Sequence, residues 1–195
     1  CLNSGASTNQ LILEVIYPTI EYVHNLYDSG KIGSAEQNLL RNIISKSLNI
    51  FNQISIVSDI KKNVIVIAAD SESVLISESA SASYHSDGWN VFHLGDMSSA
   101  INVLFDLDFQ KLVGKVWKQK PGILLVVVFS QTSEGLTFFA DSININFFRN
   151  FNTRHSTIRI FQNRNQFFSN FFSKISSNHI HLQLWYRIKT NFQLK

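Results

Sequence analysis

The sequence has few of the residues on which many common scaffolds and sites depend. Its 195 residues include one cysteine, two prolines and eight glycines. The single cysteine, Cys1, excludes an internal disulfide framework and a cysteine-based zinc site, and such usage is typical of a reducing cytosol. No uncharged apolar run of about 18 residues occurs, and the N-terminus lacks a basic stretch followed by an apolar one. We therefore expect a cytoplasmic location, with neither a membrane span nor a signal peptide.

Patterns for common catalytic and phosphate-binding sites are also missing. The six histidines form no HExxH pattern, and no GxSxG, GxGxxG or GxxxxGK[ST] occurs. His179 and His181 alternate along a predicted strand, but no third metal ligand is evident beside them. Residues 130–135, SQTSEG, fit either an anion site at a helix N-terminus or ordinary N-capping of a helix. We therefore predict a protein that is not an enzyme, with no catalytic residues and no metal site.

The charge is unevenly spread along the chain. Apolar residues make up 45% and charged residues 16% of the sequence, which is enough to build a globular core. Residues 1–140 carry 9 Lys and Arg against 13 Asp and Glu, whereas residues 141–195 carry 8 against one. The basic C-terminal third fits a surface that faces nucleic acid or an acidic partner, and it equally fits an ordinary solvated surface.

Hydrophobic periodicity divides the chain into a helical beginning and an alternating remainder. Helical spacing predicts a helix over 9–27, with either a kink at Pro18 or two short helices that meet there, and a second helix over 34–52. Ser34-Ala35-Glu36-Gln37 is a candidate capping box at the start of the second helix. The predicted strands are 63–69, 89–94, 123–129, 157–161 and 179–186. The further predicted helices are 72–86, 109–119, 135–148 and 164–175.

Strands that alternate with helices are typical of a parallel sheet covered on both faces. We predict an α/β protein, with a small N-terminal helical bundle over 1–58 and a Rossmann-like (flavodoxin-like) parallel β-sheet domain over 59–195. Ligands of such sheets bind outside the carboxyl ends of the strands. The expected ligand loops therefore follow Ala69, Leu94, Phe129 and Phe161.

Two stretches carry a resemblance to a known family. They are VIYPTIEYVHNLYDSGKIGSAEQNLLRNIIS at 15–45 and DGWNVFHLG at 87–95, with predicted strands on either side in matching order. A helical bundle followed by this alternating unit resembles the cobalamin-binding effector domain of MerR-type transcriptional regulators. The resemblance implies a homo-oligomer that contacts DNA through a winged-helix domain upstream of this chain, with a protein partner as a further possibility.

The family residues that cover the upper face of the corrin are replaced here. The family places a Trp, nine residues and then Glu-His on the helical bundle. In this sequence the same spacing gives Tyr27, nine residues, and then Gln37 and Asn38. The spacing is kept while all three residue types differ, so an aromatic ring remains but the carboxylate and the imidazole do not.

The family residues of the lower face are replaced as well. The family has an Asp/Glu-x-His-x-x-Gly loop whose His ligates cobalt, and the acidic residue orients that His. The matching stretch begins at Ser71, which puts Ser73 at the His position and Ile76 at the Gly position. Ser130 fits the Ser that the family uses to hold the nucleotide tail, whereas Gln162 and its neighbour stand where the family has a Gly pair.

These replacements lead to one main prediction and two alternatives. We predict a sensory or oligomerisation domain of a MerR-type regulator that has a cobalamin-binding fold and holds no cofactor through a histidine. The first alternative is true cobalamin binding in the base-on form, or binding of another tetrapyrrole such as haem. The second is a carrier or transferase subunit, which the missing cobalt-binding histidine disfavours.

Overall fold

The chain is an α/β protein built on a parallel sheet. The computed structural model describes residues 5–52, 58–59, 61–97, 111–116, 123–131, 156–161 and 180–186. Its five strands are β1 (Lys62–Ala68), β2 (Asn90–Asp96), β3 (Ile123–Ser130), β4 (Ser156–Phe161) and β5 (Ile180–Tyr186). All four pairings between neighbouring strands are parallel. The five strands predicted from the sequence and their parallel pairing are therefore confirmed.

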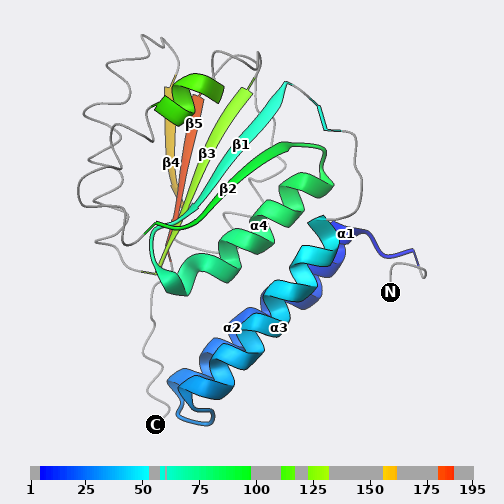
Figure 1. Ribbon diagram of the computed structural model, residues 1–195, viewed down its shortest axis with the longest axis vertical. Coiled ribbons are helices and arrows are strands. Elements are labelled where there is room, and N and C mark those ends of the chain that lie inside the picture. The colour runs from blue at the N-terminus through cyan, green and yellow to red at the C-terminus, as the bar shows by residue number, and fades with distance from the viewer. Residues whose placement is uncertain are drawn as a thin grey trace.

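The strand order departs from the expected flavodoxin-like one. The sheet runs β2-β1-β3-β5-β4, so β5 lies between β3 and β4 (Figure 1). A flavodoxin-like sheet runs 2-1-3-4-5, with the fifth strand at the edge. That part of the prediction is wrong. Of β4 and β5, the shorter strand β4 (STIRIF) lies at the edge of the sheet. Short length and a charged residue, here Arg159, are common in edge strands.

The N-terminal helices form one continuous run with an irregular middle. The run comprises α1 (Thr8–Leu11), the π-helical segment η2 (Ile12–Ile16) and α2 (Tyr17–Asp28). In η2 the Tyr17 N–H reaches back five residues to the Ile12 carbonyl. Pro18 follows in the first turn of α2, where a missing N–H costs little. The irregularity of this helical run is thus a π segment that ends two residues before Pro18.

Helix α3 (Ser34–Asn52) begins one residue earlier than the predicted capping box implies. Its N-cap is Gly33, whose carbonyl accepts the Gln37 N–H at 2.9 Å. The Glu36 carboxylate accepts a hydrogen bond from the Gly33 N–H at 2.8 Å. The predicted pairing of Ser34 with Gln37 is therefore wrong. Glu36 makes the capping contact, and Gln37 is left to face the interior.

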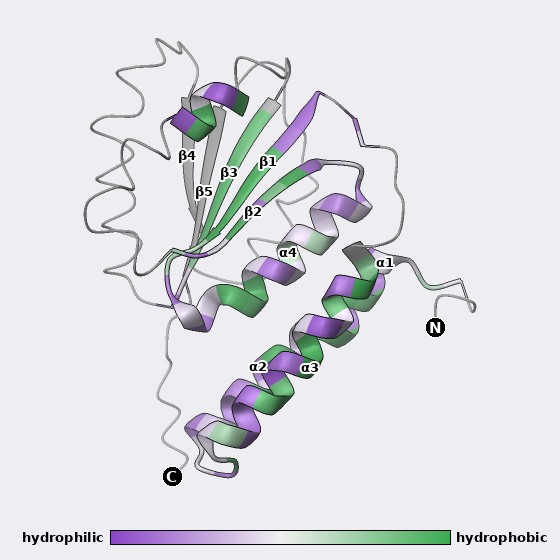
Figure 2. Cartoon of the chain, viewed as in Figure 1, coloured by the Kyte–Doolittle hydropathy of each residue, from purple (hydrophilic) through white to green (hydrophobic). Residues whose placement is uncertain are grey.

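Helix α4 (Val74–Ser86) lies between the sheet and the pair formed by α2 and α3 (Figure 1). It follows the short 3-10 helix η3 (Ser71–Ser73). Within the sheet that α4 covers, the strands β1 and β3 are the most hydrophobic (Figure 2). The helix itself is covered on both sides and buries mostly small residues: Ser77, Ser79, Ala80, Ser81, Ala82 and Ser83.

Three buried serines of α4 satisfy their hydroxyl groups within the same helix, whereas Ser83 Oγ donates to Asn9 Oδ1 of α1 at 2.7 Å. Ser77 Oγ donates to the Val74 carbonyl at 2.7 Å, and Ser79 Oγ donates to the Ile76 carbonyl at 2.8 Å. Ser81 Oγ likewise donates to the Ser77 carbonyl at 2.8 Å. Because these bonds go to carbonyls one turn back, the hydroxyls are buried without needing another element. This explains how a serine-rich helix occupies the middle layer.

Several predicted elements lie outside the described residues. These are the helices over 135–148 and 164–175, and the candidate site residue Gln162 lies outside the described residues as well. Residues 111–116 form a short helix inside the predicted 109–119. Among the described helices, none has both the length and the apolar composition needed to cross a membrane.

His93 lies on the edge strand β2 and gives a pH prediction. Its Nε2 lies 2.9 Å from Ser77 Oγ, and burial lowers the pKa of the imidazole from its usual 6.5. The unfolded chain therefore binds this proton more tightly than the folded chain does. The stability that His93 contributes is fully present above pH 6.5 and is lost as the pH falls below that value.

We expect His93→Gln to make the melting temperature fall less steeply than in the wild type between pH 7 and pH 5. Thermal melts followed by circular dichroism at several pH values measure this. An unchanged slope in the variant would contradict the assignment.

Candidate functional site

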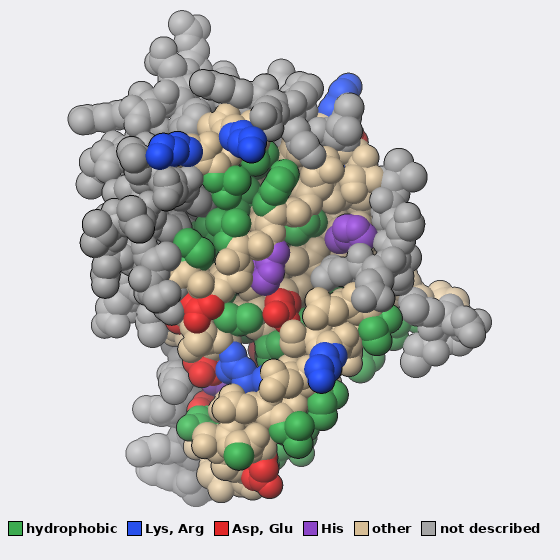
Figure 3. Space-filling view, in the orientation of Figure 1, with side chains coloured by type: hydrophobic (Ala, Val, Ile, Leu, Met, Phe, Trp, Pro, Cys, Tyr) green, Lys and Arg blue, Asp and Glu red, His purple; other side chains and the backbone are tan. Residues whose placement is uncertain are grey.

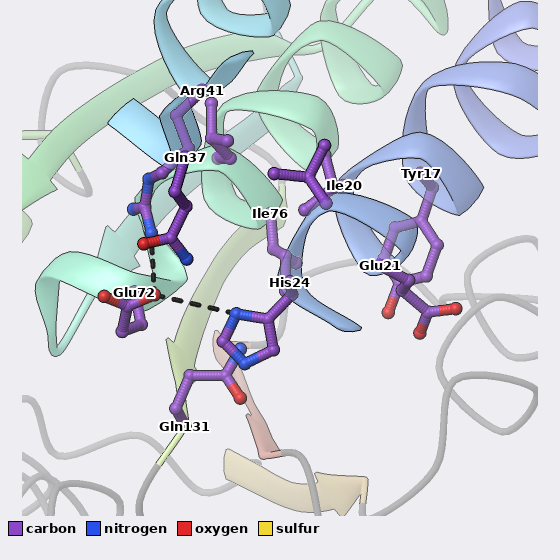
Figure 4. Close-up of a pocket in the computed structure, with 11 residues that line it drawn as sticks. Tyr17, Ile20, Glu21, His24, Gln37, Arg41, Glu72, Ile76 and Gln131 are labelled. Atoms are coloured by element: carbon purple, nitrogen blue, oxygen red, sulfur yellow. Dashed lines mark hydrogen bonds and ion pairs between the residues drawn. The ribbon is translucent and has the colours of Figure 1, made fainter. Parts of the chain in front are cut away.

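A pocket lies where the helix pair meets the carboxyl ends of β1 and β3. In the space-filling view, acidic and basic side chains gather at this junction (Figure 3). The pocket is closed on one side by α2 and α3 and on the other by η3, the start of α4 and the residue after β3 (Figure 4). It is lined by Tyr17, Ile20, Glu21, Val23, His24, Gln37, Arg41, Glu72, Leu75, Ile76 and Gln131.

Asp70 organises the sheet side of the site. It is the first acidic residue after the apolar run of β1, and it caps η3 through a 2.8 Å bond from the Ser73 N–H to its Oδ1. Its Oδ2 accepts the Ser130 hydroxyl at 2.8 Å and the Gln131 N–H at 2.7 Å. A carboxylate is thus held where helix N–H groups and a strand-end hydroxyl would otherwise suit a bound anion.

This arrangement bears on the anion-site interpretation of Ser130. The Ser130 side chain is fully buried, and its hydroxyl donates to Asp70. A phosphate at this point would meet the negative charge of Asp70 at close range. The geometry therefore disfavours an anion site here. The rest of SQTSEG, from residue 132 onward, lies outside the described residues.

Arg41 joins the helix pair to the loop after β1. Its Nη1 donates to Glu72 Oε2 at 2.7 Å, and its Nη2 donates to the Ser71 carbonyl at 2.5 Å. The Arg41 side chain is 19% exposed and that of Glu72 is 43% exposed. A partly exposed ion pair of this kind contributes about 1 kcal/mol or less to stability. Its larger effect is geometric, because two planar contacts fix the guanidinium across the junction.

His24 on α2 contacts the same carboxylate from the other side. Its Nδ1 lies 3.8 Å from Glu72 Oε2, and its Nε2 lies 3.6 Å from Asp28 Oδ2 one turn along the helix. Figure 4 shows Glu72 between Arg41 and His24, with Gln131 beneath the imidazole. The two ring nitrogens of His24 point at different carboxylates, so His24, Asp28 and Glu72 do not converge on one metal ion. No group of three metal-ligating side chains occurs in the described part of the chain.

The interior of the pocket is small and lined by both apolar and polar side chains. Its volume is about 20 Å³, which holds one or two water molecules. Drug-sized ligands occupy pockets of roughly 300–1,000 Å³. Gln37, 6% exposed, and Gln131 offer amide groups, and Gln131 Oε1 is buried without a hydrogen-bond partner among the described residues. An ordered water fits that position better than an organic ligand does.

The structure brings only part of the predicted site together. Gln37 lines the pocket, and Ser71 reaches its edge through the carbonyl that accepts Arg41. Asn38 is exposed and Tyr27 is 41% exposed, and neither lines the pocket. Ser73 is fully buried beneath the loop.

The loop presents Glu72 to the helices in place of Ser73. Glu72 lines the pocket and Ser73 does not. The residue opposite the helix pair is therefore one position earlier than the family match implies. Neither side chain is an imidazole, so no cobalt ligand is gained by this shift.

Arg41 and His24, two pocket residues that were not predicted, had a usable signal in their spacing. Gln37, Arg41, Ile44 and Leu48 follow one another at intervals of four, three and four, which is one face of a helix. Ile44 and Leu48 are core residues, so the polar pair on the same face must also point inward. His24 follows the buried Val23 and lies four residues after Ile20, which places it at the edge of the buried face of α2.

The described residues do not fit a histidine-ligated corrinoid. The side chain that reaches toward the helices from the loop after β1 is Glu72, and it is paired with Arg41. The space between these elements is filled by direct contacts between them. No protein-family model matches the sequence, and no curated protein matches it significantly.

Proposed function

We propose that the chain is a regulatory domain of a MerR-type transcriptional regulator, with a helical bundle placed on a Rossmann-like sheet of the cobalamin-binding type, and that it works without a bound corrinoid. In this proposal the domain is not catalytic. It acts through contacts with other protein chains, while a winged-helix segment of the same regulator contacts DNA.

The observation that carries the proposal is the double contact of Arg41. The guanidinium bonds the Glu72 carboxylate and the Ser71 carbonyl, so α3 is attached directly to the loop after β1. A planar cofactor between helix pair and sheet would have to break both bonds and separate the two layers. The small pocket and the buried Ser73 support the same conclusion.

The test is an absorbance titration of the chain with hydroxocobalamin and with adenosylcobalamin in the dark, followed by size exclusion. We expect each spectrum to equal the sum of its components and no corrinoid to elute with the protein. Arg41→Ala, which removes both bonds across the junction, should give the same result, because it supplies no cobalt ligand. Asn42→Ala, on the same helix but exposed, is the matched control.

Binding of either corrinoid to the wild-type chain would overturn the proposal. A base-on spectrum would support a true cobalamin domain in which cobalt keeps its own base. A histidine-ligated spectrum that disappears in His24→Ala would assign the ligand to α2, since His24 is the imidazole that lines the pocket.

A further inference from the structure

Helix α3 has a second regular face that nothing in the described structure covers. Glu36, Leu39, Ile43, Lys46 and Ile50 follow one another at intervals of three, four, three and four. Leu39 is 62% exposed, Ile43 52% and Ile50 61%, and the two charged residues are also exposed. We call these five residues the α3 seam. In Figure 3 hydrophobic side chains line the outer edge of the helix pair, with charged groups among them.

The α3 seam is separate from the face that α3 uses within its own chain. The inner face carries Ile44 and Leu48, which are 6% and 1% exposed, together with Gln37. Single exposed apolar residues are normal on a protein surface and need no explanation. Three at regular spacing along one side of a helix form a stripe, and intervals of three and four are those of the a and d positions of a coiled coil.

The order of charges along the seam favours one kind of partner. When two copies of α3 lie antiparallel about a twofold axis near residue 41, Leu39 of each copy faces Ile43 of the other. The same register sets Glu36 opposite Lys46 at both ends. A parallel pair would instead place Glu36 against Glu36 and Lys46 against Lys46, which is unfavourable. From Glu36 to Lys46 the seam is therefore self-complementary in the antiparallel arrangement alone.

We propose that α3 is a homodimerisation surface, on which a second copy of this chain docks its own α3 antiparallel through the α3 seam. In a twofold dimer the same patch serves both copies, so each apolar and each charged contact occurs twice. The seam spans 15 residues from Glu36 to Ile50, about 21 Å of helix. This inference goes beyond the proposed function and does not depend on it, because the seam faces away from the pocket side chains Gln37 and Arg41.

The test is the mass of the full chain in solution by sedimentation equilibrium over a range of concentrations. We expect a reversible dimer of twice the 22.2 kDa chain mass. Ile43→Lys places a charge at the centre of the seam and should raise the dimer Kd about 100-fold, as loss of a central contact does. Asn38→Lys adds the same charge at an exposed position off the seam and should leave Kd within about twofold of the wild type.

A charge exchange tests the antiparallel register itself. Lys46→Glu should weaken the dimer about tenfold, because two carboxylates then face each other at both ends. The double variant Glu36→Lys with Lys46→Glu should recover the wild-type Kd. Glu36 also caps α3 through Gly33, so circular dichroism must show that the double variant keeps its helix content.

Three results would overturn the homodimer. They are a wild-type chain that stays monomeric at every concentration, a dimer that Ile43→Lys leaves intact, and a Lys46→Glu defect that the second exchange does not repair in a folded protein. A monomer that instead captures an amphipathic peptide would assign the seam to a different partner. Corrinoid titration reports on the pocket alone, so failure of one proposal leaves the other standing.

Discussion

Replacing Asp70 by alanine should lower the free energy of unfolding by about 3–5 kcal/mol. One carboxylate accepts the Ser73 N–H, the Ser130 hydroxyl and the Gln131 N–H, and it thereby ties the end of β1 to the end of β3. Hydrogen bonds to a charged group contribute about 1.5–3 kcal/mol each, and buried donors left without a partner add to the loss. Ser73 and Ser130 are both fully buried, so water does not readily replace the carboxylate.

Urea unfolding followed by far-ultraviolet circular dichroism measures this loss. Asp59→Ala is the matched control, because the Asp59 carboxylate accepts a single exposed bond, from the Lys61 N–H at 2.9 Å. It should cost about 1 kcal/mol or less. Asp70→Asn should fall between the two, since an amide keeps one acceptor oxygen but turns an N–H toward donors on its other side. A loss no larger at Asp70 than at Asp59 would show that the bridge is not important for stability.

Enlarging the buried face of α4 should have the second largest effect. Ala80 is 2% exposed in the helix that lies between the sheet and the α2–α3 pair. Leucine at this position adds three carbon atoms to a layer packed on both sides. Overpacking of this kind costs about 1–3 kcal/mol. We expect Ala80→Leu to reach the upper end of that range, because neither neighbouring layer can move away without losing contact with α4.

The same urea experiment applies, with Ser86→Leu as the control. Ser86 is the last residue of α4 and is only partly buried, so leucine there should change stability by about 0.5 kcal/mol or less. Equal effects at Ala80 and Ser86 would mean that the middle layer has spare room. A larger loss at Ala80, with the unfolding slope unchanged, would support close packing on both sides of α4.

Among the described residues, strands and helices that depend on local pattern were predicted correctly, and relations between distant segments were not. The apolar runs of β1 and β3 identify buried parallel strands, because strands covered on both faces carry few polar residues. The exchange of β4 and β5 in the strand order depends on which strand pairs with β3, and periodicity along the chain carries no such information. The cap of α3 was displaced by one residue because Ser34, Glu36 and Gln37 all suit a helix start in composition.

The site was predicted in part for a related reason. A match by linear spacing selects Gln37 and Asn38 together, but consecutive helical residues lie about 100° apart, so only Gln37 faces the pocket. The same limit applies to the loop after β1. There the 3-10 turn directs Glu72 outward and Ser73 inward, and counting residues along the sequence does not reveal that choice.

The small side chains of α4 have a mechanical consequence. Tightly packed interiors resist compression, so the α2–α3 pair cannot move closer to the sheet through a layer of serine and alanine. Short side chains without deep interlocking offer little resistance to sliding along the helix axis, and sliding of packed helices is a common form of domain motion. Any rearrangement of the helix pair relative to the sheet is therefore expected to be a shear parallel to α4, limited by the attachment of Arg41 at one end and of Asn9 to Asp87 at the other.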